Sequence, residues 1–125
     1  MSHKNKKQFG VWMDKHQATV VGKENIDSGD FVILGHVENT DNESHPTEKS
    51  ENNAERTFQH KFFKQITAHM QNAEDVHITG TGIAQEQLIH YLAETAQFKN
   101  TVAKESTSNK MSDEKLVEYI TEKFN

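Results

Sequence analysis

The 125-residue sequence contains no cysteine, a single proline and no long apolar run. Without cysteine, disulfides, thiolate zinc sites, iron–sulfur clusters and cysteine nucleophiles are excluded, so any chemistry rests on oxygen and imidazole groups. No apolar stretch approaches the roughly 20 residues that a helix needs to cross a bilayer, and the polar residues Met1 to Gln8 lack the apolar core of a secretion signal. The length is that of one ordinary domain. We therefore expect a cytoplasmic protein with a single domain over residues 1–125 and no membrane contact.

Charges are distributed unevenly along the chain, although the net charge is only −5. Residues 1–23 carry five lysines and one aspartate, whereas residues 38–55 carry six acids and one lysine. This segregation predicts a basic patch and a separate acidic segment. We expect a flexible basic tail over residues 1–8. We also expect an acidic mobile loop over residues 38–53, because this segment has almost no large apolar side chain and holds the single proline, Pro46.

Hydrophobic periodicity gives a consistent order of elements. Alternating or continuous apolar runs predict strands, and apolar residues at three- and four-residue steps predict helices. The predicted strands cover residues 9–13, 18–22, 31–37, 75–79 and 101–104, and the predicted helices cover 54–73, 83–98 and a last helix that begins at the Ser112 cap. The order βββαβαβα indicates an α/β fold with a mixed five-stranded sheet, in which crossovers pair parallel strands and helices cover the faces. This is the topology of the ribonuclease H-like fold.

The chain resembles a known family in three segments, which are Val11-Trp12-Met13-Asp14-Lys15-His16-Gln17-Ala18, Ile78-Thr79-Gly80-Thr81-Gly82-Ile83-Ala84 and Lys110-Met111-Ser112-Asp113-Glu114-Lys115-Leu116-Val117. It resembles the short bacterial "translational machinery" proteins, which are similar to the middle domain of archaeal and eukaryotic release factors and of Pelota, the ribosome-rescue protein. The last of these segments continues through Phe124, and the resemblance implies a domain of this type over nearly the whole chain except residues 38–53. It also implies a translation-associated protein, acting in rescue, stress or hibernation, whose partner is the ribosome, ribosomal RNA or tRNA and not DNA, with no cofactor.

One part of the family pattern is missing from this sequence. In release factors of the family, the segment between the third strand and the first helix carries a Gly-Gly-Gln motif that promotes hydrolysis of peptidyl-tRNA. Here that segment is the acidic loop 38–53, which contains no glycine and would be repelled by RNA phosphates. Pelota-like domains also lack the motif, so we expect a non-enzymatic role. The alternative is a protein-interaction module that docks the acidic loop onto a basic partner.

Basic residues and one glycine turn form the candidate contact surface. On the first predicted helix, Arg56, His60 and Lys64 recur at four-residue steps with Lys61 beside them, opposite the apolar stripe. Such a stripe can grip phosphates without reading sequence, and the plain alternative is a solvated helix face. The tail lysines could extend this footprint; these are Lys4, Lys6 and Lys7. The turn Gly80-Thr81-Gly82 joins a strand to a helix and predicts a backbone contact to a partner through free helix amides, or simply a compact turn.

A metal-dependent nuclease is the third reading, because ribonuclease H-like enzymes hold two divalent metals with clustered carboxylates. Asp14 lies past the end of the first predicted strand and Asp75 at the start of the fourth, so the sequence does not bring carboxylates to one end of the sheet. The eight histidines are scattered without an HxH, HxxxH or HExxH pair. We therefore expect no metal site. Three histidines beside apolar runs are expected as hydrogen-bonded core or sheet residues; these are His36, His69 and His77.

Overall fold

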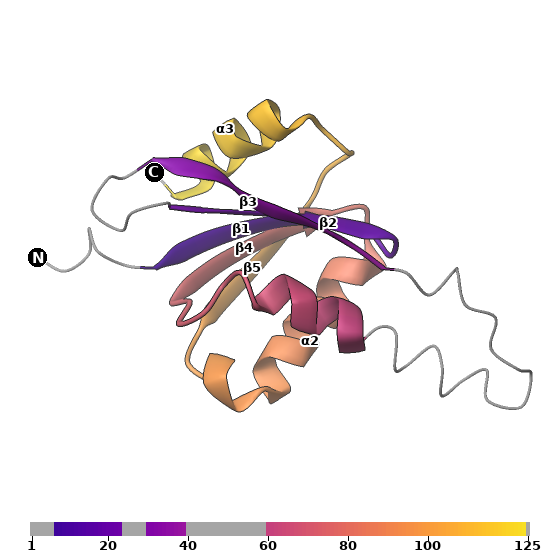
Figure 1. The fold of residues 1–125 in the computed structure, drawn as a ribbon, viewed down its shortest axis with the longest axis vertical. Coiled ribbons are helices and arrows are strands. Elements are labelled where there is room, and N and C mark those ends of the chain that lie inside the picture. The colour runs from indigo at the N-terminus through magenta and orange to yellow at the C-terminus, as the bar shows by residue number, and fades with distance from the viewer. Residues whose placement is uncertain (1–6, 24–29, 40–59, 125) are drawn as a thin grey trace, which may run out of the picture.

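The computed structural model describes residues 7–23, 30–39 and 60–124, and its elements follow the predicted βββαβαβα order (Figure 1). A helix covers residues 60–67 of the described part. The other elements are β1 (Gln8–Met13), β2 (Gln17–Lys23), β3 (Phe31–Glu38), β4 (Asp75–Gly80), α2 (Ile83–Glu94), a short 3-10 helix (Ala96–Phe98), β5 (Val102–Thr107) and α3 (Asp113–Phe124).

The five strands form one mixed sheet in the order β3-β2-β1-β4-β5. The first three strands form an antiparallel meander, because short turns can only join antiparallel neighbours. β4 pairs parallel with β1, and β5 pairs parallel with β4, because helical crossovers return the chain to the same end of the sheet. This arrangement confirms the predicted α/β fold with a mixed, ribonuclease H-like sheet.

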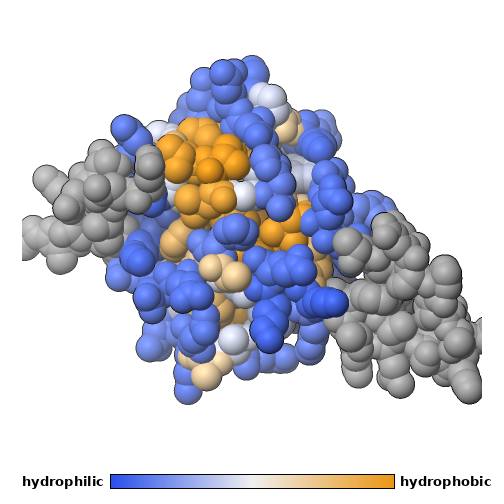
Figure 2. Space-filling model, in the orientation of Figure 1, coloured by the Kyte–Doolittle hydropathy of each residue, from blue (hydrophilic) through white to orange (hydrophobic). Residues whose placement is uncertain are grey.

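Helices cover the sheet on both faces, as Figure 1 shows: α3 lies on one face, and the helix over residues 60–67 lies with α2 on the other. Successive residues of a strand point to opposite faces, so Val11 of β1 is buried on the α2 side while Trp12 is buried against α3. Each face therefore has its own apolar core, and β1 supplies side chains to both. Apolar surface is also visible along the course of β3, an edge strand (Figure 2).

The first helix ends earlier than predicted. The apolar period runs to Ala73, but the helix ends at residue 67 and the chain then turns. The His69 amide bonds to the Ile66 carbonyl, a step of three residues that tightens the turn, and Asn72 has a φ of 64°, which asparagine tolerates better than most residues. Met70 and Ala73 are nevertheless buried in the core, so they continue the apolar pattern without being helical.

The elements around β4 also differ from the prediction in length. α2 ends at Glu94 because Thr95 takes an extended conformation, and the 3-10 helix then places Phe98 in the core. β5 continues to Thr107 instead of ending at residue 104, because it pairs with β4 along its whole length. The polar run after residue 104 hid this strand, since backbone pairing to a buried neighbour and not side-chain burial defines it.

The two segments predicted as tail and loop are described only at their boundaries. Gln8 is the first residue of β1 and Glu38 the last of β3, while residues 1–6 and 40–53 lie outside the described residues. None of the helices within residues 7–23, 30–39 and 60–124 is both long and apolar enough to span a membrane.

Candidate nucleic-acid interface

The helix over residues 60–67 separates charged from apolar side chains. His60, Lys61 and Lys64 are exposed. Phe63 and Ile66 are buried in the core on the α2 side. The His60 ring meets the edge of Tyr91 in α2, with ring centroids 5.7 Å apart, which fixes the start of the described helix against its neighbour. Three of the predicted basic residues are therefore exposed on one helix, and Arg56 lies outside the described residues.

The predicted tail contributes one described residue. Lys7 is half-buried, and its carbonyl accepts hydrogen bonds from the amides of Glu74 (2.9 Å) and Asp75 (3.2 Å) just before β4. Its backbone is therefore held at the start of the sheet. Lys4 and Lys6 lie outside the described residues.

The Gly80-Thr81-Gly82 turn is tightly built. A Cβ atom at Gly80 would overlap the Met13 carbonyl oxygen, so only glycine lets the ends of β1 and β4 approach this closely. Gly82 has a φ of 148°, which L side chains rarely adopt. The Gly82 amide donates to Gln85 Oε1 at 2.9 Å, so the fold already uses one of the amides predicted to be free. Thr81 is exposed between the two glycines.

A connected set of polar side chains lies on the α3 face of β4 and β5. The register pairs Trp12 with Thr79 and Thr79 with Ser106, so these residues share the face on which Trp12 packs against α3. Ser106 Oγ lies 2.8 Å from His77 Nε2 and 2.8 Å from the Tyr119 hydroxyl, and it donates to Thr79 Oγ1 at 3.0 Å. Thr79 Oγ1 lies 2.8 Å from Ser108 Oγ. We call this set the hydroxyl network: His77, Thr79, Ser106, Ser108 and Tyr119.

The direction of these hydrogen bonds limits their chemistry. A serine hydroxyl has one proton, and Ser106 gives its proton to Thr79. Ser106 Oγ can then accept one hydrogen bond from His77 Nε2 and another from the Tyr119 hydroxyl. In this arrangement His77 does not accept the Ser106 proton, as a base activating a nucleophile would. The prediction that His77 is a hydrogen-bonded sheet residue is confirmed.

Three exposed lysines surround the hydroxyl network, and they come from β5, the following loop and α3. Lys123 Nζ lies 5.2 Å from the centroid of the Tyr119 ring, and Lys110 Nζ lies 5.9 Å from that of Trp12. Lys104 is paired in register with His77. We call these residues the lysine rim: Lys104, Lys110 and Lys123.

Burial and the lysine rim set the titration of the network. Burial lowers the pKa of His77, and the charges of Lys123 and Lys104 lower it further. Burial raises the pKa of Tyr119, but hydrogen bonds that Ser106 and Thr79 can donate to its ionised oxygen, together with the charge of Lys123, outweigh this effect and leave the pKa below its usual value. The network therefore lies in a positive local potential.

Asp14, the acid considered for a nuclease, has a structural role in the hairpin. Its Oδ1 accepts the amides of His16 at 2.8 Å and Gln17 at 2.9 Å, which closes the turn between β1 and β2. In the part of the chain that the structure describes, no group of three His, Asp or Glu side chains is arranged to hold a metal ion.

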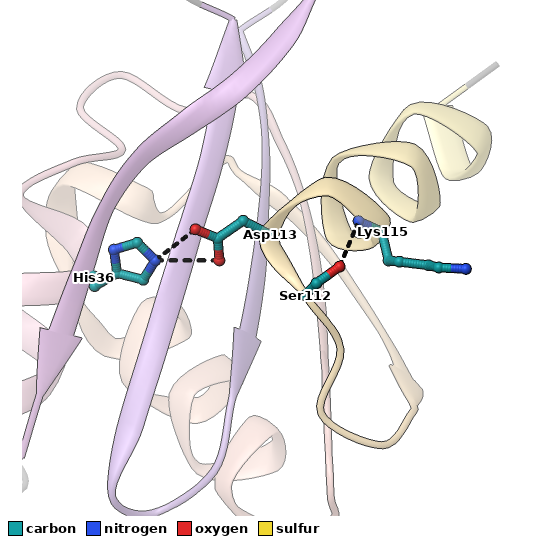
Figure 3. Close-up of polar contacts among 4 residues, drawn as sticks. All are labelled: His36, Ser112, Asp113 and Lys115. Carbon is teal, nitrogen blue, oxygen red and sulfur yellow. Dashed lines mark hydrogen bonds and ion pairs between the residues drawn. The ribbon is translucent and has the colours of Figure 1, made fainter.

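A second histidine joins β3 to the beginning of α3 (Figure 3). His36 Nε2 lies 3.2 Å and 3.0 Å from the two carboxylate oxygens of Asp113, and both side chains are more than half exposed. Beside them, Ser112 Oγ accepts the Lys115 amide at 3.3 Å, so Ser112 caps the helix as predicted. His36 is thus a hydrogen-bonded sheet residue at the surface.

Sequence reasoning missed the hydroxyl network and the lysine rim. The available signal was the alternation of Lys104, Ser106 and Ser108, which share one face of a strand. That alternation has meaning only if the strand continues to Thr107, and the polar composition of the segment concealed it.

No protein-family model matches the chain, and no curated protein sequence matches it. Among solved structures, the Thermoplasma acidophilum Pelota protein matches with a TM-score of 0.63 and 18% sequence identity, covering 97% of this chain and 34% of that one. The archaeal translation termination factor aRF1 matches with a TM-score of 0.57 and 15% identity, covering 95% of this chain and 35% of that one. The chain thus spans about a third of each of these proteins, and it shares the fold of that part.

Proposed function

We propose that this chain is a non-enzymatic, translation-associated protein that binds the ribosome or its RNA. The observation that supports this most is a fold shared over nearly the whole chain with Pelota and with a translation termination factor. Fold alone does not define function, so the contact surface and its charge must support the same conclusion.

The proposed contact surface is the basic side of the first helix. His60, Lys61 and Lys64 are exposed there, and Arg56 precedes His60 by four residues. Lysine and arginine contacts to phosphate position a protein on RNA without reading its sequence, and they weaken as salt rises. The tail lysines and the Gly80-Thr81-Gly82 turn would add secondary contacts. The resemblance to the ribosome-rescue protein favours a role in rescue, stress or hibernation.

The proposal excludes peptidyl-tRNA hydrolysis as the activity. The segment that carries Gly-Gly-Gln in release factors has no glycine in this chain. Deleting residues 40–53 separates the proposal from the acidic-loop alternative: binding through lysines survives or improves, whereas a module that uses the acidic loop loses its partner. A cleavage assay on RNA and RNA–DNA hybrids with magnesium or manganese tests the nuclease alternative.

Cosedimentation with ribosomes at two salt concentrations tests the proposal. The wild-type protein is expected in the ribosomal pellet at low salt and largely in the supernatant at high salt. Lys61→Glu with Lys64→Glu should stay in the supernatant at both. The matched control is Lys15→Glu with Lys99→Glu, which changes the charge equally at two exposed lysines elsewhere and should pellet like the wild type. A wild-type protein that never pellets contradicts the function, and a Lys61/Lys64 variant that pellets normally contradicts the placement.

A further inference from the structure

The α3 face of the sheet is apolar over β1, β2 and β3 and polar over β4 and β5. The core under α3 takes side chains from Trp12 of β1, Val21 of β2 and Phe31 of β3, together with α3 itself. Neither β4 nor β5 contributes to that core. Tyr119 is the α3 side chain that reaches across to β5, where its hydroxyl meets Ser106. His77 and Thr79 are therefore buried beside Tyr119, whereas Val102 and Lys104 are exposed along β5.

The polar side chains of β4 and β5 on this face bond to one another. Every buried side-chain nitrogen or oxygen in the described part of the chain has a hydrogen-bond partner, so the hydroxyl network holds a fixed arrangement. Gln85 adds to it by donating to the Ser106 carbonyl at 2.9 Å. Along β5 on this side, Lys104 is exposed and Val102 is half exposed. The buried network thus gives a fixed support to the exposed side chains along β5.

The lysine rim gives this face its charge. Lys104, Lys110 and Lys123 make no ion pair with a carboxylate in the described part of the chain. Lys110 and Lys123 instead lie over aromatic rings, which holds their charges beside the network. Glu105 follows Lys104 but lies on the opposite face of β5, Asp113 bonds to His36, Asp75 pairs in register with Val102, and Glu122 is next to Lys123 on α3. The cations are therefore available to an anionic partner.

We infer that the lysine rim and the β4–β5 face around the hydroxyl network form a second RNA-binding surface, which contacts the phosphates of a single-stranded segment. The inference rests on the proposed function for the nature of the partner. Exposed lysines along one edge of a sheet can follow the phosphates of a single strand. An acidic peptide would instead need apolar pockets for its anchor residues, and this face offers only Val102.

The position of this surface has a consequence for the molecule. The helix over residues 60–67 and the lysine rim lie on opposite sides of the sheet, because α3 and α2 cover opposite faces (Figure 1). A single RNA segment therefore cannot contact the first helix and the lysine rim without passing around the edge of the sheet. The protein would therefore lie between two RNA segments, one on each side.

Fluorescence anisotropy with a labelled single-stranded RNA oligonucleotide tests the inference. Lys104→Glu with Lys123→Glu is expected to weaken binding at low salt by at least about tenfold, whereas the Lys15/Lys99 control changes it less than about twofold. Both lysines are exposed, so folding should be preserved. Lys104→Gln with Lys123→Gln provides a milder variant, and it should lower the slope of log Kd against log salt by about 1.4.

The outcomes separate this inference from the proposed function. If the Lys104/Lys123 variants bind the oligonucleotide normally while the Lys61/Lys64 variant fails to pellet with ribosomes, the inference is wrong and the proposed function stands. If the wild-type protein binds RNA through Lys104 and Lys123 but never pellets with ribosomes, the inference stands and the ribosomal partner is wrong. If polyglutamate displaces the RNA at equal charge concentration, the face selects acidic chains in general and the inference is overturned.

Discussion

At the scale of single residues, Gly80 determines how closely β1 and β4 meet. A Cβ at this position would collide with the Met13 carbonyl, which is backbone and cannot move without breaking the ladder. We predict that Gly80→Ala lowers the free energy of unfolding by about 3 kcal/mol, measured by chemical denaturation. Thr81→Ala, at the exposed next position, serves as the control and should change it by less than about 0.5 kcal/mol. Equal stabilities of the two variants would contradict the close approach.

His77 gives the folded protein a defined response to acid. Its pKa lies below the ordinary 6.5, first because of burial and then because of Lys123 and Lys104. Below pH 6.5 the unfolded chain takes up a proton at this position before the folded chain does, so stability falls as the pH drops through the folded pKa. We predict that His77→Gln flattens the loss of unfolding free energy between pH 6.5 and 5, because glutamine can still donate to Ser106.

The matched control for that measurement is His90→Gln, on the exposed side of α2. This variant should keep the pH dependence of the wild type. A His77→Gln curve that runs parallel to the wild type over the same pH range would show that the acid response comes from other groups.

At the scale of elements, the sequence predicted strands and helices best where the local apolar pattern agrees with burial. β1 is one continuous buried run, and α3 repeats its apolar residues at helical spacing; both were found within one residue of their observed starts. The predicted C-terminal ends of the first helix and of β5 were wrong for opposite reasons. Met70 and Ala73 are buried without being helical, and β5 is a strand without being buried. In both cases the neighbouring element, not the local sequence, decides the conformation.

The attachment of α3 also mixes predictable and unpredictable contacts. Ser112 as the cap and Leu116 and Ile120 as the buried side follow from residue type and period. The pairing of His36 with Asp113 brings together residues 77 positions apart, and nothing local indicates it. Because both side chains are exposed, this pair contributes little to stability compared with the buried leucine and isoleucine. Its effect is to fix where the start of α3 meets β3.

At the scale of the whole molecule, only one of the two candidate contact surfaces could be predicted from the sequence. The basic side of the first helix could be predicted, because charged and apolar residues alternate at helical spacing within a few residues. The lysine rim could not be predicted, because Lys104, Lys110 and Lys123 come to the same side of the sheet only once α3 is packed on it. Because α3 packs on the face opposite α2, the two basic surfaces lie on opposite sides of the sheet.

The two cores should nevertheless unfold together, because β1 gives Val11 to one and Trp12 to the other. We predict that Leu116→Ala, in the α3 core, and Leu88→Ala, in the α2 core, each lower the unfolding free energy by about 2–5 kcal/mol in a single transition. Trp12 is the only tryptophan and lies in the α3 core, so its fluorescence reports that side, while circular dichroism reports the whole molecule.

Coincident fluorescence and circular dichroism transitions in both variants would support one cooperative unit. If Leu116→Ala is too unstable to study, Ile120→Val makes the same comparison at a cost of about 1 kcal/mol. A fluorescence transition that shifts in Leu116→Ala while part of the dichroism signal stays at the wild-type midpoint would mean that the α3 side opens alone. The lysine rim would then be assembled only while α3 is docked, since Lys123 belongs to that helix.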